Sequence, residues 1–292
     1  MGRFYLTIAF TLVGTSIVAA RFVSAYIPPF SISFFSFAFA SLTAILFCGK
    51  KMFHTAKSIS KRTWTTIILQ AVLGSFLFRA FLTLGLQHIG AIEAGIIIGA
   101  TPAITVSLAR IILREYLSPR IVIGISVTFA GILLVQGFPF EMSLERMLSL
   151  GAIFILCAAA CESFFTILSR KIHVSSQVET LCPVAHAGFI SLIAMVLCFV
   201  PALVEQPLEA IKELPYTGWL ALLWYGNVVT IVAFTCMFAG AKRCSGYTIA
   251  AFAGLIPITS AVLSVIVLRE PVIIYHIIGC GLIVISIIII SH

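Results

Sequence analysis

One sequence pattern occurs twice in this chain, and the two copies are separated by about half its length. Residues 102–115 are PAITVSLARIILRE, and residues 257–270 are PITSAVLSVIVLRE. Both copies run from a proline to a final Leu-Arg-Glu, at an offset of 155 residues. Each copy lies in an apolar stretch long enough to cross a bilayer. Two similar membrane-embedded halves are typical of transporters, because a site between them can open to either side of the membrane.

The composition makes lipid the solvent for most of the chain. Hydrophobic residues are 61% of the sequence and charged residues only 10%, against about 25% charged in a typical soluble domain. One polytopic membrane domain uses all 292 residues, so we expect no soluble catalytic module and no cofactor. The ten acidic residues are all glutamate, which argues against a metal–aspartate site. We therefore expect no metal, and we interpret the eight cysteines as small buried hydrophobic residues.

Apolar runs predict an all-α polytopic membrane protein with ten transmembrane helices. We expect the first run to be a membrane span and not a cleaved signal, because its length of about 20 residues is enough to cross the bilayer. The predicted spans are residues 4–23, 29–48, 64–86, 91–113, 119–137, 148–169, 179–200, 217–239, 245–268 and 272–290.

The distribution of Lys and Arg predicts the orientation. The 49–63 segment carries five basic residues and no acidic one, and other basic residues follow the even-numbered spans. The positive-inside rule then places both termini in the cytoplasm, and the compact chain without long tails fits a bacterial inner membrane. The net charge of +8 thus indicates orientation and not a nucleic-acid partner. Two interpretations stay open for 49–63: a segment on the inner membrane surface, or a plain basic loop.

Five spans in each half make an odd number, so the second half enters the membrane upside down relative to the first. We therefore expect a 5+5 inverted repeat. Its first repeat is residues 1–137, its connecting loop is 138–147, and its second repeat is 148–292.

The repeated residues resemble a known family. A small-residue helix start, then a proline, then Leu-Arg-Glu, occurs at Ala91–Glu115 and again at Gly246–Glu270, each followed by further glycines. This arrangement resembles the EamA-type transporters of the drug/metabolite transporter superfamily, over essentially the whole chain. The resemblance implies a 5+5 inverted repeat around a central cavity and a carrier that exports small organic molecules. The chain departs from many relatives at Arg79, where they are uncharged.

Three charged residues are predicted to lie inside the membrane, where a charge is expensive and marks a candidate functional site. Arg79 and Glu93 lie on the outer side, where they could pair as a gate or clamp the charged groups of a zwitterion. Glu162 is the candidate for proton coupling, because a partly desolvated carboxyl titrates nearer neutrality. Buried structural ion pairs are the alternative for all three.

Polar and aromatic residues in later spans are further candidates. Trp224, Tyr225 and Asn227 could line a site for an aromatic or cationic substrate, and Tyr247 lies at the start of the ninth span. His186 could shuttle protons. The alternative is that the aromatic residues pack or face lipid, and that His186 is a hydrogen-bonded packing residue.

Two prolines are predicted to kink their helices. Pro102 and Pro257 cannot donate a backbone hydrogen bond, so the carbonyls of Ile98 and Ala253 lose their helical partners. Those carbonyls could hold a substrate or an ion, or the kinks could only shape packing.

The leading hypothesis is a secondary transporter that moves a small metabolite, an amino acid or a drug-like compound. We expect export by alternating access through rocking of the two halves, with a proton or substrate gradient as the energy source. The protein would be a monomer or a homodimer whose partners are its small-molecule substrate and the bilayer. A metabolite importer and a lipid or lipid-precursor flippase remain alternatives. Neither an enzyme nor a channel is favoured, because the sequence has no catalytic set and no filter-like loop.

Overall fold

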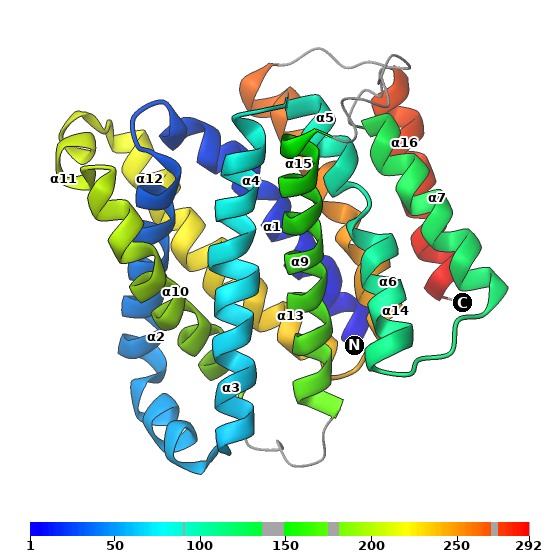
Figure 1. The fold of residues 1–292 in the computed structure, drawn as a ribbon, viewed down its shortest axis with the longest axis horizontal. Coiled ribbons are helices and arrows are strands. Elements are labelled where there is room, and N and C mark those ends of the chain that lie inside the picture. The colour runs from blue at the N-terminus through cyan, green and yellow to red at the C-terminus, as the bar shows by residue number, and fades with distance from the viewer. Residues whose placement is uncertain (90, 136–148, 175–180, 270–273, 292) are drawn as a thin grey trace.

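The fold is a bundle of helices, described by a computed structural model over residues 1–89, 91–135, 149–174, 181–269 and 274–291 (Figure 1). Within these residues there is no strand. Seven of the described helical runs are long and apolar enough to cross a membrane, and three shorter apolar helices accompany them. The expectation of an all-helical, multi-pass membrane protein is confirmed.

The helices of the first half follow the predicted spans with shifts of a few residues. They are α1 (Gly2–Ser24), α2 (Pro29–Ser58), α3 (Lys61–Gln70), η1 (Ala71–Leu77), α4 (Phe78–Leu86), α5 (Ala91–Ile98), α6 (Thr101–Ile112) and α7 (Pro119–Val135).

The helices of the second half follow in the same way, with two short helical turns between α10 and α12. They are α9 (Leu150–Val174), α10 (Pro183–Val204), α11 (Pro207–Ala210), η2 (Ile211–Glu213), α12 (Tyr216–Trp224), η3 (Tyr225–Val232), α13 (Ala233–Ala241), α14 (Gly246–Ala253), α15 (Leu255–Leu268) and α16 (Ile274–Ser291).

Helix α2 continues ten residues past its predicted end at residue 48. The added turns are not a loop, because one side of them is packed: Met52 and Thr55 are buried, and Met52 lies directly on Gly188 of α10. Burial of these side chains explains why the basic segment stays helical up to Ser58.

The third and eighth spans each contain a π-helical segment that the apolar pattern did not predict. The segment η1 joins α3 to α4, and η3 joins α12 to α13. Their first residues are 154 positions apart and their last residues 155. A π-helix is a wider turn that is found often at functional sites.

The fourth and ninth spans are each broken just before the repeated proline. A turn at Gly99 and Ala100 separates α5 from α6, and Gly254 separates α14 from α15. Pro102 and Pro257 therefore lie in the first turn of a new helix, where proline is well tolerated. The prolines were expected to kink continuous helices. Instead, each helix is interrupted and a new helix begins just before the proline.

The principal helix pairings join the first half of the chain to the second. Helix α2 packs along α10 and α7 packs along α16 (Figure 1). Helix α1 packs on α13 and α15, and α9 packs on α4 and α6. The two halves are thus interleaved and are not separate bodies, which bears on how any movement could occur.

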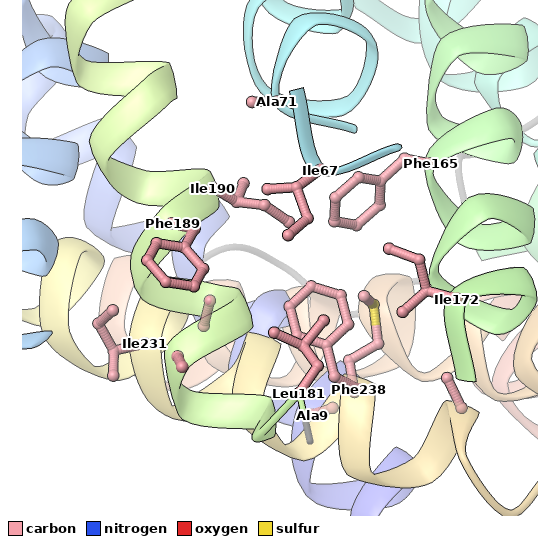
Figure 2. Close-up of a cluster of buried hydrophobic side chains, with 14 of the residues drawn as sticks. Ala9, Ile67, Ala71, Phe165, Ile172, Leu181, Phe189, Ile190, Ile231 and Phe238 are labelled. Atoms are coloured by element: carbon pink, nitrogen blue, oxygen red, sulfur yellow. The ribbon is translucent and has the colours of Figure 1, made fainter. Parts of the chain in front are cut away.

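The largest apolar cluster lies where α3, α9, α10 and α13 meet. Figure 2 shows Ile67, Phe165, Ile190 and Phe238 converging there. The rings of Phe165 and Phe238 are 6.2 Å apart between centroids. This packing fixes the backbone around the polar groups described next.

Candidate functional site

Arg79 lies at the start of α4, directly after η1, and its side chain reaches across the bundle. Its guanidinium donates one hydrogen bond to the Ser33 hydroxyl at 2.6 Å and one to the Tyr225 hydroxyl at 2.8 Å. It also lies over the rings of Phe37 and Tyr225, at 5.2 and 5.1 Å from their centroids. Two of the five guanidinium N–H donors are used in these hydrogen bonds, and both acceptors are neutral.

The sequence singled out Arg79 and Tyr225 separately, and the structure brings them together. The expected partner, Glu93, lies in α5, but its side chain is outside the described part of the chain. Ser33 and Phe37 were not singled out. Their position one turn apart on α2, in a run of Ser and Phe, was the signal that could have marked them.

Trp224 and Asn227 point to other helices than Tyr225 does. The Trp224 indole donates to the Thr15 hydroxyl of α1 at 2.8 Å. The Asn227 carbonyl oxygen accepts from the Thr43 hydroxyl of α2 at 2.7 Å. Both residues thus tie the region of η3 to helices of the first half.

Tyr247 lies in the first turn of α14, away from Tyr225. It packs against an apolar cluster formed by α6, α7, α14 and α16, with Val106 and Ile121 among its members. The structure therefore does not group Tyr247 with Arg79 and Tyr225.

Glu162 is the central residue of α9 and faces the break between α5 and α6. Its carboxyl lies near the Thr101 hydroxyl. The next residue, Ser163, donates to the Thr101 carbonyl at 3.2 Å and accepts from the Thr105 hydroxyl at 3.0 Å. The candidate coupling residue and the repeated proline segment thus lie together, which neither motif alone predicted.

The Ile98 carbonyl, which Pro102 leaves without its usual helical donor, has a partner. The Thr101 hydroxyl donates to it at 2.6 Å. Since a hydroxyl has one proton, Thr101 can meet the Glu162 carboxyl as an acceptor while it donates to Ile98. The carbonyl is therefore held within the helix break in this structure.

His186 lies in the first turn of α10, because that helix begins at Pro183 and not near residue 179 as expected. It is fully buried, its Nε2 is 2.7 Å from the Gln70 Oε1, and its ring stacks on Phe238 at 3.9 Å. Gln70 also donates to the Ser169 hydroxyl at 2.8 Å. This geometry matches the alternative of a hydrogen-bonded packing residue.

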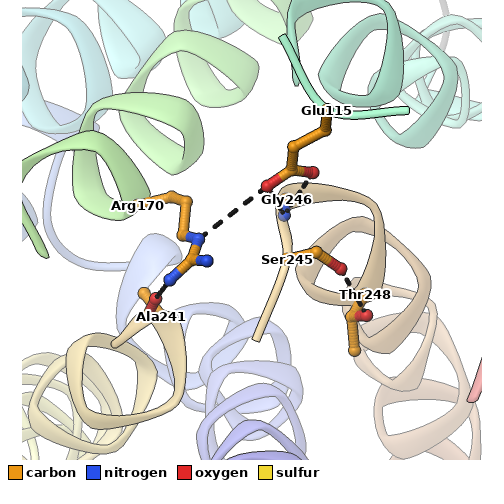
Figure 3. Close-up of polar contacts among 6 residues, drawn as sticks. All are labelled: Glu115, Arg170, Ala241, Ser245, Gly246 and Thr248. Atoms are coloured by element: carbon orange, nitrogen blue, oxygen red, sulfur yellow. Dashed lines mark hydrogen bonds and ion pairs between the residues drawn. The ribbon is translucent and has the colours of Figure 1, made fainter. Parts of the chain in front are cut away.

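Glu115, from the repeated Leu-Arg-Glu, caps a helix of the other half (Figure 3). Its two carboxylate oxygens accept from the Gly246 backbone N–H at 3.0 and 2.9 Å. Arg170 lies 3.8 Å from the same carboxylate and donates to the Ala241 carbonyl at 2.8 Å. The corresponding Glu270 lies outside the described residues.

Both arginines of the two Leu-Arg-Glu segments adopt the same unusual backbone conformation. Arg114 and Arg269 each have φ of 55°, the left-handed region that commonly ends a helix. The repeated pattern thus encodes a helix end in both halves. Among the described residues, no group of three or more His, Cys, Asp or Glu side chains could hold a metal ion.

These apolar helices, with polar side chains bonded between them, define a multi-pass protein embedded in a membrane. The chain belongs to the EamA-like transporter family, whose model matches residues 1–136 and 149–292. Membership assigns it to membrane transport.

Several individual proteins resemble the chain over nearly its whole length. The uncharacterized transporter YetK of Bacillus subtilis is 28% identical over 285 residues, covering 96% of this chain and 83% of the relative. The uncharacterized transporter YyaM of the same organism is 24% identical, covering 97% and 93%. One protein crystal structure, 20% identical, covers 99% of this chain and 96% of its own with a TM-score of 0.78. That likeness shows the fold.

Proposed function

We propose that this protein is a secondary transporter that carries a small organic metabolite, an amino acid or a drug-like compound across the cytoplasmic membrane, in the direction of export. The transport class follows from the family. The observation that carries the proposed mechanism is the recurrence of the same structural irregularities in both halves of the chain.

Three irregularities recur at offsets of 154 to 155 residues. They are the π-helical segments η1 and η3, the breaks before Pro102 and Pro257, and the φ values of Arg114 and Arg269. These support ten spans arranged as a 5+5 inverted repeat, with repeats over 1–137 and 148–292. The three shorter apolar helices would complete spans four, five and ten.

Alternating access would move two bundles that each mix helices from both repeats. The interleaved packing argues against rocking of the two five-span halves, because the principal pairings cross between them. One bundle would hold α1, α2, α12–α13 and α14–α15. The other would hold α3–α4, α5–α6, α9 and α10, so the α2–α10 and α6–α14 pairings would be the surfaces along which the two bundles move. Each helix of one bundle has its counterpart from the other repeat in the other bundle. This equivalence is what a symmetric transport cycle requires.

Two side-chain contacts between these bundles, one polar and one a ring stack, are suited to act as gates. Arg79 bonds to Tyr225 on the proposed outer side, and His186 stacks on Phe238 on the proposed inner side. Gln70 holds His186, and it is the repeat equivalent of Tyr225, at an offset of 155. Opening the outer contact while the inner one stays closed would expose the site to the outside, and the converse would expose it to the cytoplasm.

Arg79 and Tyr225 are the proposed centre of substrate binding. The unused guanidinium donors can form a paired hydrogen bond with a carboxylate, and the Tyr225 and Phe37 rings offer an apolar surface. Glu93 would receive an amino group, and Trp224, Asn227 and Tyr247 would contribute at the edges of the path.

Glu162 is the proposed proton-coupling residue. It is the central residue of α9 and lies against the break in the fourth span. A protonated carboxyl completes the Thr101 contact by donating to it, whereas an ionised carboxylate needs the Thr101 proton that now bonds Ile98. Proton loss would therefore release the Ile98 carbonyl and loosen the break.

The proposed location is a bacterial inner membrane with both termini in the cytoplasm. Both chain ends lie at the same side of the bundle as the α2–α3 and α6–α7 connections (Figure 1). The basic 49–63 segment supports the cytoplasmic assignment of that side.

Flux in proteoliposomes tests the proposal, with a panel of amino acids, nucleosides and cationic drugs and with or without a pH gradient. Saturable uptake of one class that competitors block is expected. In the Glu162→Gln variant, we expect the pH-driven component to disappear while exchange between preloaded substrates continues. No flux of any soluble compound by folded protein would overturn the proposal in favour of a lipid flippase. Unchanged pH-driven flux in Glu162→Gln would overturn only the coupling role.

A further inference from the structure

The cytoplasmic extension of α2 forms a rigid basic platform. A helix of 30 residues is about 45 Å long, whereas the hydrocarbon core is about 30 Å thick. The last ten residues, 49–58, therefore reach past the hydrocarbon region into the zone of the lipid headgroups. Residues 49–58, which extend α2 beyond its predicted span, thus lie at the membrane surface.

The platform has one buried face and one exposed face. Met52 and Thr55 are buried at 4% and 6% exposure, so the extension is fixed to the bundle. Lys50, Phe53 and Lys57 recur at spacings of three and four residues on the opposite face, and all three are exposed. Residues at such spacings lie on one side of a helix.

An exposed aromatic ring stands among these cations. Phe53 is 60% exposed, and the Lys57 ammonium lies 4.2 Å from its ring centroid. An apolar ring flanked by lysines suits the boundary between lipid headgroups and acyl chains. Lys51 lies near the Cys182 thiol and lowers the pKa of that thiol.

The connection to the next helix extends the basic surface. Lys61 and Arg62 begin α3 and are exposed, and the Trp64 indole donates to the Ala56 carbonyl at 3.4 Å. This bond holds the start of α3 against the end of α2. The cations of both helices are thus presented together.

A shallow hollow lies on the surface of α2 next to this platform. It has a volume of about 330 Å³ and is lined by residues 45–51. Along the helix its lining changes from apolar (Ile45, Leu46 and Phe47) to basic (Lys50 and Lys51). This order along α2 matches an acyl chain followed by a negatively charged headgroup.

We propose that the platform formed by residues 45–62 binds anionic phospholipid of the adjoining leaflet, with the headgroup phosphate against Lys50, Lys57, Lys61 and Arg62. Charge complementarity carries the assignment, because residues 49–63 contain five basic residues and no acidic one. Cations at this depth are attracted to a negatively charged leaflet within a Debye length of its surface. This binding is separate from transport and does not depend on the substrate.

The test measures lipid selectivity of the full chain in vesicles of phosphatidylcholine that contain a minor fraction of phosphatidylglycerol. Spin-labelled phosphatidylglycerol and spin-labelled phosphatidylcholine report the immobilised fraction of each lipid. The native protein should immobilise phosphatidylglycerol preferentially, and high salt should reduce the preference. The triple variant Lys50→Gln, Lys57→Gln and Lys61→Gln should lower the relative association constant at least about fivefold, which corresponds to roughly one cation near an anionic surface.

A matched control removes three exposed cations that lie away from the platform. The variant Arg120→Gln, Lys171→Gln and Lys242→Gln carries the same charge change and should keep most of the selectivity. Equal thermal midpoints of the two variants in detergent establish that both are folded. Equal loss in both variants, no preference in the native protein, or displacement of the lipid by millimolar inorganic phosphate would each overturn the proposal.

Discussion

Both carboxylate oxygens of Glu115 lie within 3.0 Å of the Gly246 backbone nitrogen, 131 residues further along the chain. An acid that follows α6 in the first half thus caps the first turn of α14 in the second half. The helix dipole favours a negative charge at this place. A side chain on Gly246 would meet Ala109 and the Glu115 carboxylate at 3.0 and 3.3 Å, so glycine allows the close approach.

Replacing Glu115 by Gln should lower stability by about 1 kcal/mol, the usual effect of losing a cap with its dipole interaction. The thermal midpoint in detergent measures this change. Glu209→Gln serves as the control, because Glu209 is exposed and should be neutral. An unchanged midpoint in Glu115→Gln would mean that the cap contributes nothing to the fold.

Thr101 and Pro102 should show compensating effects on stability. Thr101→Val removes the hydroxyl that bonds Ile98 and should cost about 1–3 kcal/mol, because it leaves a carbonyl unpaired. Adding Pro102→Ala restores a backbone N–H for the same carbonyl, so the double variant should regain part of the loss. A double-mutant cycle of unfolding free energies measures the coupling, and strict additivity would contradict it.

Arg79 should determine the affinity for a carboxylate substrate. Arg79→Gln should raise KM for such a substrate about tenfold or more, because a charge-assisted hydrogen bond contributes about 1.5–3 kcal/mol. Arg79→Lys should give an intermediate KM, because it keeps the positive charge but loses the paired N–H donors of the guanidinium. Initial rates in proteoliposomes provide KM and turnover. Equal KM values in the native and Gln proteins would make Arg79 a structural residue.

The two contacts between bundles should shift the conformational equilibrium in opposite directions. Tyr225→Phe removes the acceptor of Arg79 and should favour opening on the outer side, and His186→Leu should favour opening on the inner side. Loss of the Arg79–Tyr225 hydrogen bond or of the His186–Phe238 ring stack, each worth about 1 kcal/mol, changes the ratio of the two states about fivefold.

Distances between spin labels measure these shifts. Labels at residues 86 and 216 report the ends of α4 and α12 on the proposed outer side, and labels at residues 61 and 242 report the ends of α3 and α13 on the proposed inner side. Tyr225→Phe should lengthen only the first distance, and His186→Leu only the second. A shift of the same sign in both variants would refute alternate opening.

Two cysteines outside the apolar spans should differ in the pH dependence of alkylation. Burial raises the pKa of Cys182, but hydrogen bonds from the Val184 and Ala185 backbone and from Lys51 bring the pKa below its usual value. Burial raises the pKa of Cys244, and nearby cations offset this only in part. Since the thiolate is the reactive form, Cys182 should reach half its maximal rate at lower pH than Cys244.

Single-cysteine proteins and a thiolate-selective reagent measure the two profiles. Lys51→Gln should move the Cys182 profile to higher pH and leave the Cys244 profile unchanged. Coincident profiles in the native chain would contradict the assigned causes.

The membrane class and the positions of most helices could be predicted from the sequence, because apolar runs and prolines act locally. The π-helical segments could not, because no local pattern distinguishes Ala71–Leu77 from an ordinary apolar helix. The extension of α2 depends on Met52 meeting Gly188, a contact between distant parts of the chain. For the same reason the hydrogen bond between Arg79 and Tyr225 could not be predicted, although the sequence marked both residues as candidates.

The paired π-helical segments also bear on the history of the chain. A π-helical turn holds about one residue more than an α-helical turn. Since η1 and η3 occupy matching places in the two halves, the proposed repeat implies that the wide turn was present before the duplication. A single ancestral unit would then already have carried it.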